Sequence, residues 1–439
     1  MASYQPKKEW RGRTKIADIQ TFVDQIHMID VHEHLPTQAM RAKDQVGFFD
    51  LMHYLDSDFV SVGADREALK RFSALEKKEK AAYFLTYYKK CSNTHYAKLL
   101  KKALEDLYDF NDWSVEGILA LDERITAFSK DPELYQKVLV DKAKIDLAIT
   151  LIITTNVNLD YFLPVLFYDD YFHVRCAEDL HKLEKETAEQ VSDFSAYLAL
   201  IDKVMEQHIV AGCPAIKLGH AYFRTLEMTE PCLEKSEKVF LMMKNKQEAL
   251  LKEDDYRTFE DTLIHHIIQK AAAHDLPIQI HTGLQETSVS GDGNDLRHAR
   301  AAHLIPLFLK YPQARFVLLH ASTPYIYEYA AIVKNFPNVY ADMTWTYGIS
   351  PSLAEQALEL LTDMVPQTKI FGFGGDYNHI EGTYAVSKVA RQVLAKVLKR
   401  RIETGYFSEE EAKNFALHIF RNNAIDFYKL NGLEKGAVL

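Results

Sequence analysis

The chain has 439 residues, 47% of them hydrophobic, and carries a formal charge of −10 at pH 7. This length suits two ordinary domains or one large α/β barrel with insertions. Because a nucleic-acid-binding surface needs a basic stripe, which this acidic chain lacks, we expect no nucleic-acid partner.

Eight short apolar runs are predicted to be β-strands, each ending in polar or glycine-containing residues. Continuous apolar runs are typical of strands that are buried on both faces of a parallel sheet. The runs occupy residues 27–31, 146–154, 161–168, 215–219, 277–283, 315–321, 339–344 and 369–376.

Helical patterns lie between the later strands, over residues 296–311, 324–336 and 352–365. Ser350 and Pro351 are expected to be the cap and the first turn of the third helix. Alternation of strands and helices predicts right-handed βαβ units. Eight such strands predict an α/β fold, a closed (β/α)₈ TIM barrel.

Residues 40–140 are too many for one βα step and contain several helical patterns with no Gly/Ser-rich linker. We predict a helical insertion after the first strand that forms a lid over the barrel mouth; an independent helical domain is the alternative. Residues 1–39 then hold the N-terminal segment and first strand. Residues 141–439 hold the rest of the barrel and the C-terminal helices.

Polar residues follow several of the predicted strands at the point where each strand ends. In a closed barrel these ends share one mouth, which is where barrel enzymes place their chemistry. The candidates, in chain order, are His32, His34, Lys217, His281, His320 and Asp376.

His32 and His34 stand in the sequence DVHEH, directly after the first strand. Because alternate residues of a strand point to the same side, both imidazoles can face the barrel axis while Glu33 points away. Nitrogen and oxygen ligands on a rigid ring suit Zn²⁺ or a similar divalent ion. Such an ion lowers the pKa of bound water and makes hydroxide available.

Each of these residues also has an ordinary structural explanation. His281 and His320 could be hydrogen-bonded core histidines, Asp376 could cap a helix, and Lys217 could pair with a carboxylate. Their recurrence at the ends of different strands nevertheless predicts a metal site.

The pattern resembles the amidohydrolase superfamily of metal-dependent barrel enzymes. The resemblance is carried by DVHEH, by His281 in QIHTG, by His320 in LLHAS and by Asp376 in GFGGD. It implies one or two divalent ions, most often Zn²⁺, held by the two histidines of DVHEH together with these residues. The ending NNAIDFYKL resembles the NA-x-x-x-Y ending of the branch called amidohydrolase-2.

The resemblance leaves two points open. Lys217 stands where members with two metals carry a carboxylated lysine that bridges the ions, whereas many amidohydrolase-2 members lack it and bind one. The long insertion is similar to that of uronate isomerases and of amidohydrolase domains fused to glutamine-synthetase-like proteins. The sequence GDYNHIEGT, however, lacks the arginine and tryptophan pattern expected of a uronate isomerase.

The first functional hypothesis is a hydrolase that cleaves an amide, ester or lactone of a small molecule, with Asp376 as the catalytic proton carrier. The alternative is a zinc decarboxylase or uronate-isomerase-like enzyme with one ion, in which His320 is free to act as a base on a carboxylated substrate. A metal-binding scaffold without activity is the third hypothesis, and the presence of every expected ligand argues against it.

Four further residues are candidate substrate contacts: His220, Arg224, Trp345 and His379. Arg224 is a candidate because a guanidinium binds a carboxylate through two hydrogen bonds. A surface arginine at a helix start is the alternative.

The remaining expectations concern location and partners. Four cysteines lie far apart without a CxxC pair, which is typical of reduced thiols in a cytoplasmic protein. The first 15 residues contain no apolar core of a secretory signal, and no apolar run is long enough to span a membrane. We expect a homo-oligomer only because related barrels often form one.

Overall fold

The structure is a computed structural model that describes residues 19–151, 161–286, 295–430, 432–433 and 435. Eight parallel strands form one sheet in the order β1 to β8, so the predicted (β/α)₈ barrel is confirmed. The strands are β1 Met28–Glu33, β2 Ile145–Leu151, β3 Phe162–Phe167, β4 Ile216–Leu218, β5 Ile278–Ile280, β6 Phe316–Leu318, β7 Val339–Asp342 and β8 Ile370–Phe371. The last three residues predicted for the second strand, 152–154, lie outside the described residues.

The barrel closes where the segment after β8 meets β1. Val31 N donates to Phe373 O at 3.2 Å, and Asp376 N donates to His32 O at 3.3 Å. Because these bonds continue the parallel pairing past the end of β8, they bring the residues that follow β8 beside the end of β1. The barrel closure itself therefore places Asp376 next to His32.

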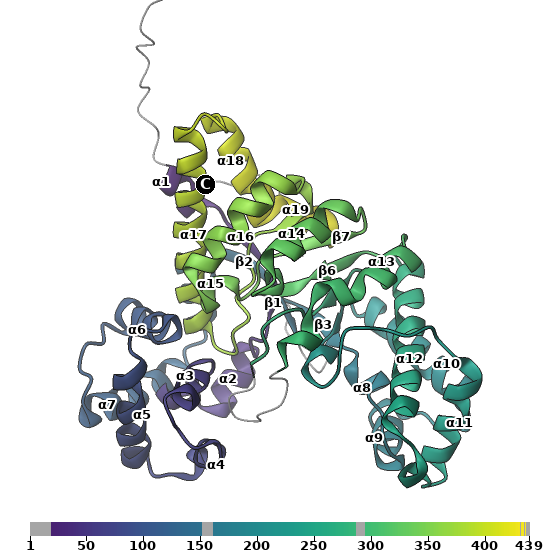
Figure 1. The fold of residues 1–439 in the computed structure, drawn as a ribbon. Coiled ribbons are helices and arrows are strands. Elements are labelled where there is room, and N and C mark those ends of the chain that lie inside the picture. The colour runs from purple at the N-terminus through teal and green to yellow at the C-terminus, as the bar shows by residue number, and fades with distance from the viewer. Residues whose placement is uncertain (1–18, 152–160, 287–294, 431, 434, 436–439) are drawn as a thin grey trace, which may run out of the picture.

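Helices surround the barrel in the second half of the chain (Figure 1). They are α13 Ile305–Lys310, α14 Ile326–Asn335, α15 Thr346–Ile349, α16 Pro351–Met364, α17 Ile380–Glu403, α18 Glu409–Leu417 and α19 Asn423–Phe427, with α1 Ile19–Gln25 packed on α17. The Ser350 side chain accepts a hydrogen bond from Leu353 N at the start of α16, which confirms the predicted cap. No helix in the described ranges combines the length and apolar character needed to cross a membrane.

The helix predicted over residues 296–311 is wrong in its extent. The structure has two 3₁₀ turns, Leu296–Ala299 and Ala301–Leu304, and only then α13. Arg300 interrupts the pattern because its backbone is extended, with φ −71° and ψ 129°. Apolar spacing could not reveal this break, since both turns still bury apolar side chains.

The segment between β1 and β2 folds into helices around a hydrophobic core of its own, drawn in purple and blue in Figure 1. The helices are α2 Gln38–Asp44, α3 Leu55–Ser61, α4 Arg66–Lys70, α5 Lys77–Cys91, α6 His95–Tyr108 and α7 Val115–Phe128, followed by a π-helical turn Gln136–Lys142. We refer to residues 38–142 as the insertion.

A buried ion pair joins the insertion to the barrel. Arg41 of α2 donates two hydrogen bonds to Glu381 of α17, at 2.9 and 2.7 Å. The Tyr108 hydroxyl of α6 donates to the same carboxylate at 2.5 Å. Because Glu381 lies five residues after Asp376, the insertion is attached directly beside the predicted site.

A second group of helices lies on the other side of the barrel in Figure 1, in teal. It consists of α9 Ala177–Thr187, α10 Phe194–Val210, α11 Leu233–Lys244 and α12 Glu253–Ala273, preceded by the short α8 Asp169–Phe172. Helices α10 and α12 lie before and after β4 along the chain.

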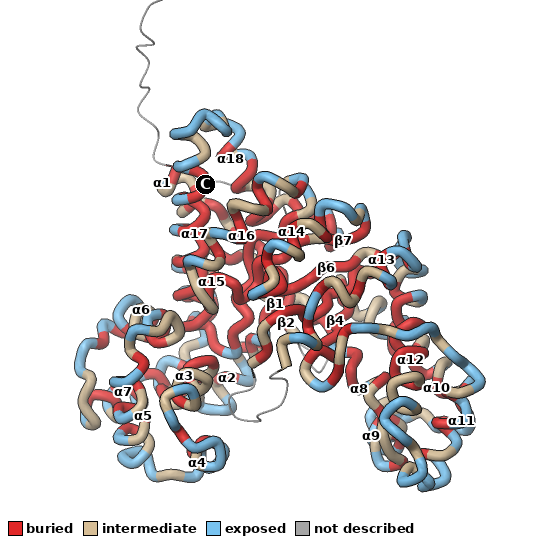
Figure 2. Tube along the Cα trace, viewed as in Figure 1, coloured by how far each residue is buried: buried red, intermediate tan, exposed pale blue. Residues whose placement is uncertain are grey.

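The two faces of the strands pack against different partners. Met28, Ile278 and Phe316 face outward into the core shared with the surrounding helices. Alternate residues such as Val31 and Val317 face the barrel interior, where they form a cluster with the C-terminal residues Ala424 to Leu430. Figure 2 shows this buried centre in red. The end of the chain thus closes the barrel interior.

Candidate metal centre

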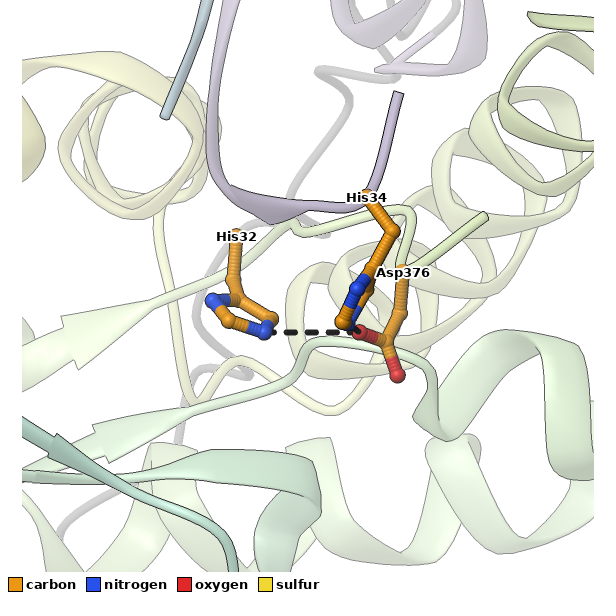
Figure 3. Close-up of side chains that lie close together, drawn as sticks. All are labelled: His32, His34 and Asp376. Atoms are coloured by element: carbon orange, nitrogen blue, oxygen red, sulfur yellow. Dashed lines mark ion pairs between the residues drawn. The ribbon is translucent and has the colours of Figure 1, made fainter. Parts of the chain in front are cut away.

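Three predicted ligands meet at the mouth of the barrel, as Figure 3 shows: His32, His34 and Asp376. One ligand atom from each lies within 4.8 Å of the other two. Asp376 Oδ1 is 3.5 Å from His32 Nε2 and 3.1 Å from His34 Nε2. His32 is fully buried, whereas the side chain of His34 is 40% exposed, so the cluster opens toward solvent on the His34 side.

The backbone around Asp376 is held in an unusual conformation by Glu33. Asp376 has φ 63°, in the left-handed region that non-glycine residues rarely adopt. Glu33 accepts hydrogen bonds from Tyr377 N at 2.7 Å and from the Thr383 hydroxyl at 2.7 Å. A Cβ on Gly375 would lie 1.8 Å from Glu33 Oε1, so only glycine fits there. Glu33 points away from the cluster and fixes the loop that carries Asp376.

His32 has the free lone pair that a metal ligand needs. Its Nδ1 lies 2.9 Å from Gln279 Oε1, an acceptor, so Nδ1 carries the proton. Its Nε2 is buried and has no hydrogen-bond partner among the described residues. Because an unpaired buried polar atom is costly, a lone pair aimed at two neighbouring ligands fits a bound cation.

His281 and His320 lie beside the cluster and contact each other. His281 Nε2 donates to Leu284 O at 2.8 Å, so its Nδ1 carries a lone pair. His320 Nε2 is 3.0 Å from that Nδ1, and His320 Nδ1 is 4.0 Å from Asp376 Oδ2. His320 Nδ1 also lies 3.2 Å from Thr344 O, so it carries the proton of that ring. The facing nitrogens of His281 and His320 then both carry lone pairs, which do not hydrogen-bond to each other.

Burial keeps these imidazoles neutral. It lowers the pKa of His32 and of His281 well below the ordinary value, with the charge of Lys217 acting in the same direction. Burial also lowers the pKa of His320 to about 4. Since only neutral imidazole offers a lone pair, all three side chains are in the form that binds metal at pH 7.

Asp376, in contrast, is ionised, because its neighbours favour the charged carboxylate more than burial disfavours it. Its burial raises the pKa, but the hydrogen bond with His34 and the electrostatic interactions with the His320, His34 and His32 rings outweigh burial, and the pKa lies well below its ordinary value. The carboxylate is therefore an anionic ligand, as a divalent ion requires.

Lys217 of β4 reaches the same region. It is only 4% exposed, and among the described residues it has neither a hydrogen bond nor an ion pair within 4.0 Å. Burial lowers its pKa to about 8, although Asp376, Asp169 and Asp342 oppose the shift. A buried ammonium without a partner is costly, which keeps this side chain a candidate for the site.

One residue of the site wall, Tyr54, comes from a place that strand-end analysis could not reach. The hydroxyl of Tyr54, in the insertion, donates to Asp376 O at 2.5 Å and Asp376 Oδ2 at 3.0 Å. Its ring stacks on Trp345 at 4.7 Å, and Trp345 meets the edge of His320. No spacing in the insertion distinguishes Tyr54 from its many other tyrosines.

The predicted substrate contacts are placed differently. Trp345 lines the cluster. His379 caps α17, because its Nδ1 accepts a hydrogen bond from Gly382 N at 3.0 Å. Its Nε2 is then a buried N–H without a partner among the described residues. Arg224 instead binds Glu260 and Asp261, and His220 is buried near Phe172. In the described part of the chain, neither Arg224 nor His220 contacts the clustered ligands.

Comparison with known proteins finds related sequences. A family model described as Amidohydrolase matches residues 239–430. Protein fluG of Emericella nidulans is 30% identical over 164 residues, which are 37% of this chain and 18% of that protein. The chain thus spans less than a fifth of the length of the curated relative it matches.

Solved structures share the fold at low identity. A uronate isomerase from Thermotoga maritima is 16% identical with a TM-score of 0.78, and covers 94% of this chain and 97% of its own. A glucuronate isomerase from Caulobacter crescentus, also 16% identical, has a TM-score of 0.76 with coverage of 97% and 96%. A Lactobacillus casei protein described provisionally as a metal-dependent hydrolase is 16% identical, with a TM-score of 0.67 and coverage of 94% and 98%.

The structural matches extend over nearly the whole barrel, and the family model covers the part that carries His281, His320 and Asp376. The resemblance that the motifs predict is therefore confirmed: the Amidohydrolase model matches residues 239–430, and the solved structures share the barrel fold.

Proposed function

We propose that this protein uses a single divalent ion to isomerise a small sugar acid, or a related hydroxy acid, by moving a proton. The observation that carries this proposal is the geometry of the ligands. Among the described residues, His32, His34 and Asp376 converge on one point, whereas His281 and His320 lie outside this group. This supports one ion rather than two.

The donor set of two imidazoles and one carboxylate suits Zn²⁺ or a similar ion. When bound, such an ion would polarise the oxygen atoms of a chelating hydroxy acid. Because His34 lies on the open side of the cluster, substrate would approach from there.

Lys217 would bind the carboxylate of the substrate. Its buried ammonium has electrostatic contact with Asp376 but no partner of its own within ion-pair distance among the described residues. A substrate carboxylate would supply that missing charge, and the charge-assisted hydrogen bond would fix the orientation of the acid.

Asp376 and Tyr54 would carry the proton. Asp376 is ionised and can accept a proton from carbon, while the Tyr54 hydroxyl already donates to Asp376. Burial raises the pKa of Tyr54 well above its ordinary value, so the hydroxyl remains a donor at neutral pH. The two groups together can take and return one proton without solvent.

The isomerases of Thermotoga maritima and Caulobacter crescentus support this choice, because they share the fold over more than nine tenths of both chains. The segment GDYNHIEGT differs from the isomerase pattern, and His379 within it offers an N–H donor instead of an arginine. The substrate is therefore proposed as an acid of this class rather than as glucuronate itself.

A hydrolase with two ions is the second candidate, and the position of Lys217 favours it. Addition of CO₂ to the neutral amine, with loss of a proton, would turn Lys217 into an anionic ligand beside His281 and His320. These three side chains would then hold the second ion.

Replacing Lys217 by methionine distinguishes the two candidates. We expect one ion per chain by elemental analysis in both the native protein and Lys217→Met, with or without bicarbonate. In a screen of sugar acids we expect the variant to raise KM about 10- to 100-fold, since a charge-assisted hydrogen bond contributes about 1.5–3 kcal/mol.

Lys369→Met is the matched control, because Lys369 binds the carbonyl oxygens of Val333 and Phe336 outside the site. Two ions per native chain, falling to one in Lys217→Met but not in Lys369→Met, would refute the proposal in favour of the hydrolase.

A further inference from the structure

Gln279 is a polar residue in the middle of β5 that faces the barrel interior. It is fully buried, while its strand neighbours Ile278 and Ile280 face the outer core. Its side chain lies between His32, at the barrel mouth, and Tyr428, which follows α19 at the end of the chain. A buried amide in an apolar strand needs every hydrogen bond satisfied, so its contacts are informative.

The contacts fix the orientation of the amide. Gln279 Nε2 lies 2.9 Å from Val31 O, which can only accept, so this atom is the NH₂ group. The same NH₂ donates to the Tyr428 hydroxyl at 3.1 Å. The remaining atom, Oε1, must then accept the hydrogen bond from His32 Nδ1 at 2.9 Å.

This orientation determines the tautomer of His32. With its proton held on Nδ1, the ring presents the lone pair of Nε2 to Asp376 and His34, and that nitrogen has no other partner in the described residues. A flipped amide would place NH₂ against Nδ1, move the proton of His32 to Nε2 and block metal binding. The hydrogen bond to Val31 O prevents the flip.

We propose that Gln279 is the residue that positions His32 for the metal, and that Tyr428 helps to hold Gln279. The proposal rests on the metal site of the proposed function, but not on its substrate. It also gives Tyr428 a role at the site. This residue lies at the other end of the barrel, where it lines a cavity of about 600 Å³ together with residues that precede the strands.

The test measures Co²⁺ binding to the full-length protein, by chelator competition and by the visible absorption of the bound ion. We expect Gln279→Leu to weaken binding about 10- to 100-fold, as loss of a partner behind a metal-binding histidine does, and to change the spectrum. Gln279→Glu, which keeps an acceptor for Nδ1, is expected to retain most of the affinity. Tyr428→Phe is expected to weaken binding less than Gln279→Leu.

Val317→Ala is the matched control, because Val317 is the register partner of Gln279 on β6, faces the same interior and has an apolar side chain that cannot hydrogen-bond to His32. It should lower the melting temperature and leave Co²⁺ affinity unchanged. If Gln279→Leu binds Co²⁺ with native affinity and spectrum, the proposal is overturned.

If Gln279→Leu does not fold, Tyr428→Phe is used as the test variant, because it removes a single oxygen atom and disturbs the packing little. Native affinity in this variant would then overturn the proposal. Native protein that binds no Co²⁺ at all would instead refute the metal site of the proposed function, so the two failures are distinguishable.

Discussion

Asp376→Asn is expected to lose the bound metal and to reduce turnover of a sugar acid by about 10²- to 10⁴-fold, the range typical of a lost proton carrier. Asparagine has nearly the same size but no charge, and Asp376 is the sole carboxylate within the three clustered ligands. Without it, two neutral imidazoles would have to hold a divalent ion next to Lys217. Elemental analysis of the purified variant measures the first effect, and kcat the second.

Asp342→Asn is the control for removing a buried carboxyl group near Lys217. Asp342 ends β7, is fully buried and accepts a hydrogen bond from Thr344 N, but does not belong to the cluster. We expect this variant to keep its metal. A full complement of ion in Asp376→Asn would contradict the ligand assignment.

Glu381→Gln is expected to destabilise the protein by about 3–5 kcal/mol, the cost of leaving one partner of a buried ion pair without the other. Arg41 and Glu381 are almost completely buried, at 1% and 0% exposure of their side chains, so water cannot replace the lost charge. The variant should also release the insertion and with it Tyr54. Urea unfolding measures the loss, and metal content reports the effect on the site.

The pH dependence of this effect has a definite sign. Burial alone would raise the pKa of Glu381, but Arg41 and His379 lower it far below the ordinary value of a glutamate. The pair therefore stabilises the protein fully above the unfolded pKa of about 4.3, and this stabilisation is lost as pH falls toward the folded pKa. The difference between native protein and Glu381→Gln should be constant from pH 5 to 8, by this argument, and shrink below roughly pH 4.

A partly buried glutamate, paired with exposed partners, provides the contrast. Glu355 pairs with Lys396 and Arg400, whose side chains are 62% and 50% exposed. Glu355→Gln should cost less than about 1 kcal/mol, as is usual for surface pairs. Equal losses in both variants would show that Arg41 and Glu381 do not anchor the insertion.

The fold was predictable because a parallel barrel buries its strands on both faces. All eight apolar runs became strands, in chain order, and strands β1 and β8 end close to His32 and Asp376 as the strand pattern predicts. Local periodicity failed at residues 296–311, where the extended backbone of Arg300 splits an apolar pattern that reads as one helix.

The site was predictable only where its residues follow strands. His32, His34 and Asp376 are brought together by the pairing of β1 with the segment after β8, which sequence spacing reflects. Tyr54 is brought there by the insertion, whose docking depends on Arg41 and a distant glutamate. Long-range packing of this kind leaves no periodic signal.

The sequence also contains a signal that the prediction from strand ends did not use, namely polar residues inside apolar strands. Gln279 interrupts the run PIQI, and a buried amide in such a place requires specific partners. Arg224 shows the converse difficulty, because a guanidinium near a strand end suggests a carboxylate substrate, yet Glu260 and Asp261 of the chain already bind it. Only the three-dimensional structure distinguishes these cases.

The hydrogen bond between Gln279 and Tyr428 has a consequence for biosynthesis. Of these three residues, His32 is synthesised first, Gln279 later and Tyr428 last. The nascent chain therefore completes the support of its first ligand only after Tyr428 has been added. Tight metal binding should require synthesis to pass Tyr428, and chains that terminate before Tyr428 should hold the ion more weakly than chains that include it.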